Sequence, residues 1–251
     1  AWLGLVDQSA ERFPELTSDQ PLMCAVWAGD LTGNGAQDLY FVNYRVNSGG
    51  GTAKDFLLIN DGTGHFSDEG EARMGELLHS AFGTAGQIHD MDGDGDLDIV
   101  KNTTLYSVAP WNSRGVLVLF NDGEGHFSNW QNLVPNASPY MFEVADFNGD
   151  GLLDLYVVDD GSDKLLTATE HVADTQLGFV TVNLGFPSSN GFGGNVHASD
   201  LDLDGDLDVV VSDVDVDIPP CNSGRRMAIY ENVDGMLSDP YGTTTFDWVT
   251  N

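Results

Sequence analysis

The chain has 251 residues, of which 41% are hydrophobic, and its 40 acidic residues against 9 Lys and Arg give a formal net charge of −31. That apolar content is ample for the packed core of one domain covering residues 1–251. The acidic excess argues against a nucleic-acid partner, which needs a basic footprint. No apolar run is long enough to predict a membrane span.

In chain order, the first predicted element is an outer strand over residues 11–17. This segment, Glu11-Arg-Phe-Pro-Glu-Leu-Thr17, aligns with Gly64-His-Phe-Ser-Asp-Glu-Gly70 further along the chain. A strand in this place would close a sheet whose other strands come from elsewhere in the chain.

Next come four repeats, each with an aspartate-rich loop that is followed at once by an apolar run. The loops read Asp30-Leu-Thr-Gly-Asn-Gly-Ala-Gln-Asp38, Asp90-Met-Asp-Gly-Asp-Gly-Asp-Leu-Asp98, Asp146-Phe-Asn-Gly-Asp-Gly-Leu-Leu-Asp154 and Asp200-Leu-Asp-Leu-Asp-Gly-Asp-Leu-Asp208. The repeats cover approximately residues 20–68, 80–129, 138–183 and 192–240. A repeat of this size with strand character is typical of propeller blades.

Each repeat is predicted to form four strands. One precedes the loop, as in Cys24-Ala-Val-Trp-Ala28, and a β-branched and aromatic run follows it. The third and fourth strands flank an Asn-Asp-Gly turn, a hairpin signal seen in Phe56 to Phe66 and again in Val116 to Phe127. We therefore expect an all-β fold, a β-propeller built of four-stranded antiparallel blades.

The loops have the spacing of a calcium site. Calcium takes several oxygen ligands, and oxygens at loop positions 1, 3, 5 and 9 can converge if the chain curls tightly. Glycine at position 6 permits that curl. An EF-hand begins in the same way but ends in Glu at position 12 and is flanked by helices, whereas strands follow here. The alternative is a set of Asp/Gly turns without metal, in which the crowded carboxylates would repel one another.

This combination of loop and hairpin resembles the FG-GAP/VCBS repeats of integrin-alpha-like β-propellers. The resemblance covers residues 12 to 239 or so, and it implies calcium in the loop between the first two strands of each blade. Seven blades are typical of that family. Carried over residue by residue, the implied ligands are Asp30, Asn34, Asp38, Asp90, Asp92, Asp94, Asp98, Asp146, Asn148, Asp150, Asp154, Asp200, Asp202, Asp204 and Asp208.

We expect three to four calcium ions, bound most tightly by loops 90–98 and 200–208, which carry the most carboxylates. Loop 30–38 is expected to be the weakest site, because Thr32 and Asn34 replace two acidic residues. Calcium would mainly support the fold.

Blade number is left open between three arrangements. These are a closed four-bladed ring, a portion of a larger propeller, and half of a ring that another chain completes. The ambiguity arises because Thr243-Thr-Thr-Phe-Asp-Trp-Val249 also reads as an outer strand or the start of a fifth repeat. A possible homo-oligomer is therefore among the expected partners.

The two cysteines, Cys24 and Cys221, are too few for a disulfide scaffold. A disulfide between them is feasible if the first and fourth repeats are neighbours; otherwise they are two separate thiols. Calcium at extracellular levels and this possible bond favour a secreted or cell-surface protein.

No nucleophile elbow, phosphate loop or His-Glu-x-x-His motif occurs. Aromatic residues in the connections, Tyr44, Tyr106, Trp111, Phe186 and Phe192, would suit sugar stacking or a protein partner, unless they pack between blades. The leading hypothesis is thus a non-catalytic calcium-binding propeller for adhesion, which binds a glycan or protein on the rim opposite the calcium loops. A lyase-like polysaccharide-active enzyme and a purely structural module of a larger assembly are the alternatives.

Overall fold

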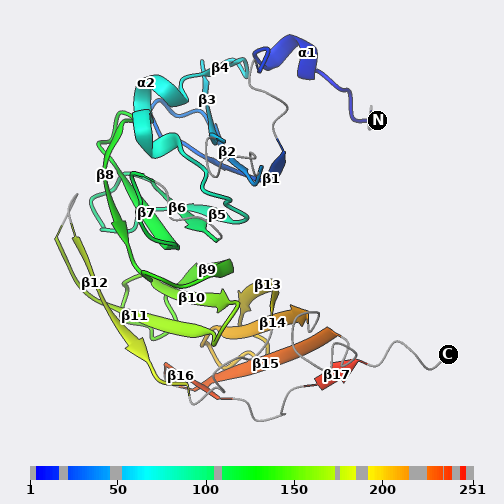
Figure 1. Cartoon of the computed structure of the whole chain (residues 1–251), viewed down its shortest axis with the longest axis vertical. Coiled ribbons are helices and arrows are strands. Elements are labelled where there is room, and N and C mark those ends of the chain that lie inside the picture. Colours follow the sequence, from blue (N-terminus) through cyan, green and yellow to red (C-terminus); the bar gives the residue numbers. More distant parts are fainter. Residues whose placement is uncertain are drawn as a thin grey trace.

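The computed structural model describes residues 4–16, 22–45, 53–104, 109–172, 176–184, 192–214, 225–233, 235–238 and 244–246. Within these residues the chain is all-β, with four antiparallel sheets that each contain four consecutive strands. The sheets follow one another along an arc, and the first strand of each lies on its inner side (Figure 1).

The strands of the first two sheets match the predicted order. The first sheet contains β1 (Met23–Gly29), β2 (Asp38–Asn43), β3 (Phe56–Asn60) and β4 (Phe66–Asp68). The second sheet contains β5 (Gly86–His89), β6 (Asp98–Thr103), β7 (Gly115–Asn121) and β8 (Phe127–Asn132). In both sheets the aspartate-rich loop joins the first strand to the second, and the Asn-Asp-Gly turn joins the third to the fourth.

The third and fourth sheets repeat this topology. The third sheet contains β9 (Pro139–Ala145), β10 (Asp154–Asp159), β11 (Lys164–Val172) and β12 (Gln176–Val182). The fourth sheet contains β13 (Phe192–Ser199), β14 (Asp208–Val214), β15 (Arg225–Val233) and β16 (Met236–Ser238). A further strand, β17 (Thr244–Phe246), pairs with the beginning of β15, so this segment adds to the fourth sheet and does not start another.

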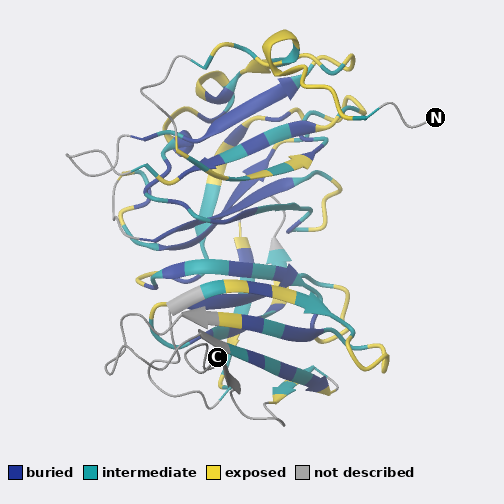
Figure 2. Cartoon of the chain, turned by 90° about the vertical axis from the view of Figure 1, so that its right-hand side faces the viewer, coloured by how far each residue is buried: buried dark blue, intermediate teal, exposed yellow. Residues whose placement is uncertain are grey.

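Three apolar clusters join the sheets, one at each junction. They form because the middle strands are apolar on both faces, as in β7, where every residue is buried. Tyr40 and Leu57 of the first sheet share a cluster with Ile99 and Leu119 of the second. The other two clusters join the second sheet to the third and the third to the fourth. Figure 2 shows buried residues along the strands and exposed residues in the turns between them.

Helical structure is short and lies beside the first sheet. Among the described residues it consists of α1 (Ser9–Arg12), α2 (Gly70–Met74) and the 3-10 helix η1 (Gly75–Leu78). The outer strand predicted over 11–17 is wrong for the described residues, because residues 9–12 are helical and 13–16 are irregular. The sequence alignment was out of register: Asp7 to Leu16 corresponds to Asp68 to Leu77, which includes a helix, and not to the hairpin end at Gly64.

Candidate metal-binding loops

The four aspartate-rich loops have the same hydrogen bond across the curl, from a backbone amide to a side-chain carboxylate. The first aspartate accepts a bond from the amide of the glycine at position 6, at 2.8 Å in Asp30–Gly35, 3.1 Å in Asp90–Gly95, 2.9 Å in Asp146–Gly151 and 3.2 Å in Asp200–Gly205. These glycines have φ between +85° and +106°, where a Cβ would be strained. The predicted need for glycine at position 6 is therefore met in every loop.

The ninth residue of each loop is a buried aspartate that holds the loop to its sheet. One carboxylate oxygen accepts from the amide at loop position 2, for example from Met91 to Asp98 at 3.0 Å. The other oxygen accepts from an amide of the third strand, as from Asn121 to Asp98 at 2.9 Å. The same pair of bonds is made by Asp38, Asp154 and Asp208. This aspartate thus holds the loop to the third strand, and its carboxylate lies at the loop, where a cation would bind.

An asparagine at the end of the third strand connects neighbouring sheets. Asn121 Nδ2 donates to the carbonyl oxygen of Leu97 in its own loop at 2.9 Å and to that of Leu31 in the preceding loop at 2.8 Å. Asn232 Nδ2 bonds Leu207 and Phe147 in the same way. Sequence reasoning took these asparagines only as a turn signal. Their recurrence just before an Asp-Gly turn, directly in Asn121 and one residue earlier in Asn232, was the available sign of a further role.

Carboxylates gather most closely in two of the loops. In each of the groups Asp90, Asp92, Asp98 and Asp200, Asp202, Asp208, the candidate ligand oxygens lie within 4.8 Å of one another. They occupy loop positions 1, 3 and 9, and all the donors are hard oxygens of the kind that calcium prefers. The residues present therefore fit such a cation. These are the two loops that were expected to bind calcium most tightly.

The residue at position 5 lies outside these two groups. Its side chain accepts a bond from the amide at position 7, at 2.9 Å from Asp96 to Asp94 and at 3.0 Å from Asp206 to Asp204. Asn34 and Asp150 make the equivalent bond. In the arrangement observed, position 5 therefore shapes the turn.

In loop 30–38 the polar side chains at positions 3 and 5 both donate hydrogen bonds within the protein. The hydroxyl of Thr32 donates to Asp38 at 3.3 Å, and Asn34 Nδ2 donates to the carbonyl oxygen of Asn60 at 3.1 Å. Among the described residues, neither this loop nor loop 146–154 brings three acidic side chains together as the other two loops do. In loop 146–154, Asn148 instead donates to Asp150 at 3.1 Å.

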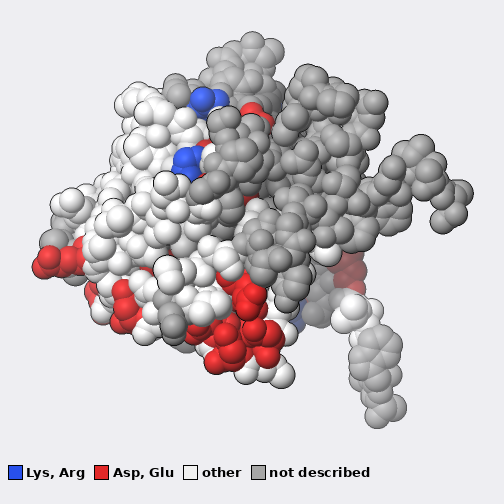
Figure 3. Space-filling view, turned by 90° about the horizontal axis from the view of Figure 1, so that it is seen from below, with Lys and Arg blue, Asp and Glu red and all other residues white. Residues whose placement is uncertain are grey.

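The local electrostatics follow from burial and from like charges. Burial raises the pKa of Asp98 to about 7, with Asp92 and Asp94 adding to the shift and two backbone hydrogen bonds opposing it. Burial also raises the pKa of Asp154. A bound cation would favour the charged carboxylates. Figure 3 views the molecule from below relative to Figure 1, and acidic side chains gather along the lower edge of this view.

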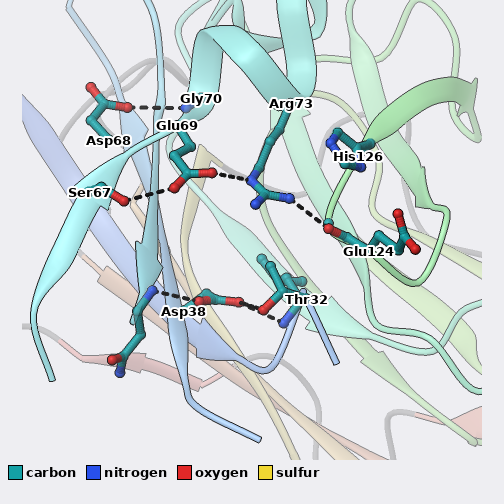
Figure 4. A network of polar contacts seen from close by, with 12 residues as sticks. Thr32, Asp38, Ser67, Asp68, Glu69, Gly70, Arg73, Glu124 and His126 are labelled. Carbon is teal, nitrogen blue, oxygen red and sulfur yellow. Dashed lines mark hydrogen bonds and ion pairs between the residues drawn. The ribbon is translucent and has the colours of Figure 1, made fainter. Parts of the chain in front are cut away.

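Beside the polar contacts of the first loop, a second set of contacts joins α2 to the next hairpin (Figure 4). Arg73 of α2 donates to the Glu69 carboxylate at 2.7 Å and to the carbonyl oxygen of Glu124 at 2.6 Å. A Cβ on Gly125 would lie 2.9 Å from the Thr32 side chain and 3.0 Å from Arg73 Nη1, so the hairpin of the second sheet sits tightly against the loop of the first. The loop of the first sheet is therefore supported by the second sheet.

The aromatic residues proposed for ligand contact have different surroundings. Tyr44 is 39% exposed and meets Phe82 edge-on at 5.7 Å. Trp111 instead packs between sheets, the alternative left open for these aromatic residues: it is 2% exposed, packs edge-on against Trp130, and covers the buried Lys101, which pairs with Asp55. Tyr106, Phe186 and the side chain of Phe192 lie outside the described residues.

Cys24 is an exposed free thiol on β1, and Cys221 lies outside the described residues, so their predicted pairing stays a prediction. The first and fourth sheets lie at opposite ends of the arc (Figure 1). None of the described helices is long and apolar enough to cross a membrane.

Comparison with known proteins identifies the repeat family of this chain. A model of the FG-GAP-like repeat matches residues 30–100, 105–157 and 146–211, and the chain belongs to this family. No curated protein matches the sequence.

Solved structures with a similar arrangement include a lectin of Agrocybe aegerita that recognises non-reducing terminal N-acetylglucosamine. It is 16% identical with a TM-score of 0.49, and the match covers 87% of this chain and 50% of that one. The exotype rhamnogalacturonan lyase YesX is 14% identical with a TM-score of 0.48, and the match covers 90% and 47%. The V. cholerae biofilm matrix protein Bap1 is 19% identical with a TM-score of 0.47, and the match covers 90% and 41%. The chain spans about half the length of these structures or less.

Proposed function

We propose that the chain is a calcium-binding β-propeller module in which calcium supports the fold and a glycan or protein is bound outside the cell or at its surface. The observation that carries the calcium part is the convergence of Asp90, Asp92 and Asp98, repeated by Asp200, Asp202 and Asp208. Family membership supports it, since the matched repeat includes all four loops.

In this proposal, the aspartates of loop positions 1, 3 and 9 would hold the ion. The ion would supply positive charge that offsets their mutual repulsion. The chain's own residues do the rest. The ninth aspartate ties the loop to the third strand, and the position-6 glycine lets the backbone curl, so the loop is largely shaped before an ion arrives.

Calcium titration by calorimetry tests the assignment. We expect Asp92→Asn and Asp202→Asn each to weaken one site by about 10–100-fold or more, the loss typical of a disturbed metal site. Asp7→Asn, which removes an exposed carboxylate outside the four loops, is the matched control and should leave the titration unchanged. Wild-type protein that takes up no calcium would contradict the proposal.

The binding part of the proposal concerns the rim opposite the loops. Among the described residues, Tyr44 offers a half-exposed aromatic ring that Phe82 supports from the side, which suits stacking on a sugar ring or an apolar side chain. Screening a glycan array with calcium present tests it. Binding that Tyr44→Ala weakens would support the assignment, and binding unchanged by Tyr44→Ala would remove this residue from it.

A further inference from the structure

The turn between β10 and β11 lies at the end of the third sheet opposite its aspartate-rich loop, because β10 begins at that loop. Asp163 holds this turn from inside. It is 5% exposed, and its carboxylate accepts from the hydroxyl of Tyr156 at 3.2 Å and from the amide of Asp159 at 3.1 Å. In the first sheet Asp55 accepts the same two kinds of bond, so the two turns are built on one scaffold.

The two turns differ in what the next sheet brings to them. Lys101 of the second sheet pairs with Asp55 of the first, and Trp111 lies over that lysine, so the charges are buried. The fourth sheet has Val211 at the place of Lys101, three residues after the ninth aspartate of its loop. A valine side chain carries no charge and ends at Cγ. No such cover therefore reaches the turn of the third sheet from this position.

A cavity of about 270 Å³ opens at the third-sheet turn. Its lining includes three residues of the turn and three at the end of β12 or just after it, namely Ser162, Asp163, Lys164, Thr181, Val182 and Leu184. Val182 and Leu184 also pack against the cluster that joins the third and fourth sheets, so one wall is apolar. The third sheet has a neighbouring sheet on each side, and the cavity thus lies within the arc (Figure 1).

The polar groups at this cavity are held in place and have capacity to spare. The ammonium of Lys164 donates to the carboxylate of Asp159 and to the carbonyl oxygen of Ser162, the latter at 2.8 Å, and its side chain is 30% exposed. An ammonium has three N–H donors, so one remains for a ligand. The hydroxyls of Ser162 and Thr181 bond none of the described residues, and a hydroxyl can both donate and accept.

The charges around the cavity favour a neutral ligand. One ammonium, that of Lys164, stands beside the two carboxylates of Asp159 and Asp163, so an anionic group would meet net repulsion. Hydroxyl groups on a ring match the spare donors and acceptors, and the C–H face of such a ring can lie against Val182 and Leu184. Ligand sites have volumes of about 300–1,000 Å³, and this cavity lies at the small end of that range, which suits a single ring.

We propose that this cavity binds one neutral sugar residue of a glycan. The hydrogen-bonding groups are Lys164, Ser162 and Thr181, and the apolar wall is Val182 with Leu184. Asp159 and Asp163 are positioning residues, because they hold Lys164 and the turn. The inference rests on the proposed function, since it names the ligand class and the place of binding on the rim opposite the loops.

Lysine labelling tests the site in the unaltered protein. The sequence has three lysines, Lys54, Lys101 and Lys164. Methyl glycosides of the common neutral hexoses and N-acetylhexosamines serve as probes, and a bound one should slow the acetylation of Lys164 several-fold, as measured by peptide mass spectrometry. Lys54 is the control, because it is 40% exposed and pairs with a carboxylate as Lys164 does. Its rate should not change. Failure of every probe to protect Lys164 would overturn the proposal.

Filling the cavity is the second test. Thr181→Trp places a large ring in it from an exposed position and should abolish both sugar binding and the protection of Lys164. Val180→Trp, at a 56% exposed residue of the same strand, is the matched control, since adjacent side chains of a strand point to opposite faces. It should bind as wild type does. Unchanged thermal melts show that both variants fold, and sugar binding that survives in Thr181→Trp would overturn the site.

The outcomes separate this site from the proposed function. Glycan binding that Tyr44→Ala weakens and Thr181→Trp leaves unchanged would overturn the cavity alone. Protection of Lys164 by a glucuronate glycoside and by no neutral sugar would overturn the neutral ligand class. A wild-type protein that binds no glycan would contradict both this site and the glycan part of the proposed function. Calcium titration, which concerns the opposite rim, should be the same in all these variants.

Discussion

At the scale of single residues, the buried side chains that link loops to strands matter as much as the exposed candidate ligands. Asp38, Asp98, Asp154 and Asp208 are each at most 2% exposed, and both oxygens of each accept backbone bonds. A buried carboxylate is tolerated when its charge is met by hydrogen bonds. The ninth loop position therefore has a structural duty whether or not an ion is bound.

Asn121 should contribute more stability than Asn60. Asn121→Ala leaves the carbonyl groups of Leu31 and Leu97 without this donor in a buried junction, which costs about 1–3 kcal/mol for each unsatisfied group. Asn60→Ala is the matched control, since its Nδ2 bonds only an exposed carbonyl of its own loop. Urea denaturation in dilute solution measures both changes. Equal losses would show that the bond between sheets adds nothing.

Leu203 is a strained position in loop 200–208. It has φ of +66° and is 85% exposed, whereas the other three loops have glycine there. The left-handed conformation costs a non-glycine residue about 1–2 kcal/mol. Replacing the leucine by glycine removes this cost, but the greater freedom of glycine in the unfolded chain opposes folding by about 0.5–1 kcal/mol.

Leu203→Gly should therefore raise the free energy of unfolding by about 0.5–1 kcal/mol. The reciprocal change, Gly93→Leu, should lower it, because Gly93 has φ of +76° and open space around its Cβ position. Denaturation of both variants checks the sign. A Leu203→Gly variant less stable than wild type would show that the leucine side chain makes a useful contact.

At the scale of the element, one loop differs from the others in how its polar groups are satisfied. Thr32 bonds Asp38, and Asn34 bonds the carbonyl oxygen of Asn60 at the hairpin, so the loop holds its shape without the carboxylates that loop 90–98 has at positions 3 and 5. The same backbone curl is nevertheless present, with Gly35 bonded to Asp30. The backbone shape of such a loop therefore does not depend on carboxylates at positions 3 and 5.

Thr32→Asp combined with Asn34→Asp should create an additional calcium site in loop 30–38, because it restores the residue types of loop 90–98 at positions 3 and 5. Calorimetric stoichiometry should rise by about one ion, since ligand charge sets calcium affinity in such loops. Thr32→Val with Asn34→Leu, which adds bulk without charge, is the control. Unchanged stoichiometry in the acidic variant would show that the packing of Thr32 under the next hairpin prevents ligation.

At the scale of the whole molecule, the sheets depend on one another. Each is apolar on both faces, and the clusters that bury those faces lie between sheets and not within them. The loops take part in these junctions through Asn121 and Asn232, which bond the loop of the preceding sheet. Loosening one loop is therefore expected to weaken the neighbouring junction.

Removing calcium should lower the melting temperature markedly. An ion present at 100 times its dissociation constant adds about 2.7 kcal/mol per site, and about 1 kcal/mol shifts the melting temperature of a chain of this size by about 2–4 °C. Two occupied sites would therefore account for a fall of about 10–20 °C in excess chelator. Scanning calorimetry measures it, and an unchanged melt after verified metal removal would contradict a structural role for calcium.

The repeats and their four-stranded sheets were predictable because they rest on local signals. A nine-residue loop with glycine at position 6 has few ways to curl, and an Asn-Asp-Gly turn between apolar runs has few alternatives to a hairpin. The closing strand predicted over 11–17 was wrong, because no such local signal supported it. The prediction rested on a short alignment that had the wrong register and did not indicate a helix. The segment is held by a contact between Arg12 and Gly64, which lie 52 positions apart, so no local pattern could show it.

The sequence by itself therefore determined the all-β class, the number of loops and the residues that could hold a cation, since all of these follow from spacing along the chain. Tertiary structure alone decided which carboxylates converge, that Trp111 is buried, and that the ninth aspartate and the asparagine of the third strand join loops to sheets. It also left the first and fourth sheets apart at the ends of an arc. These features depend on contacts between distant residues, whose partners no local pattern specifies.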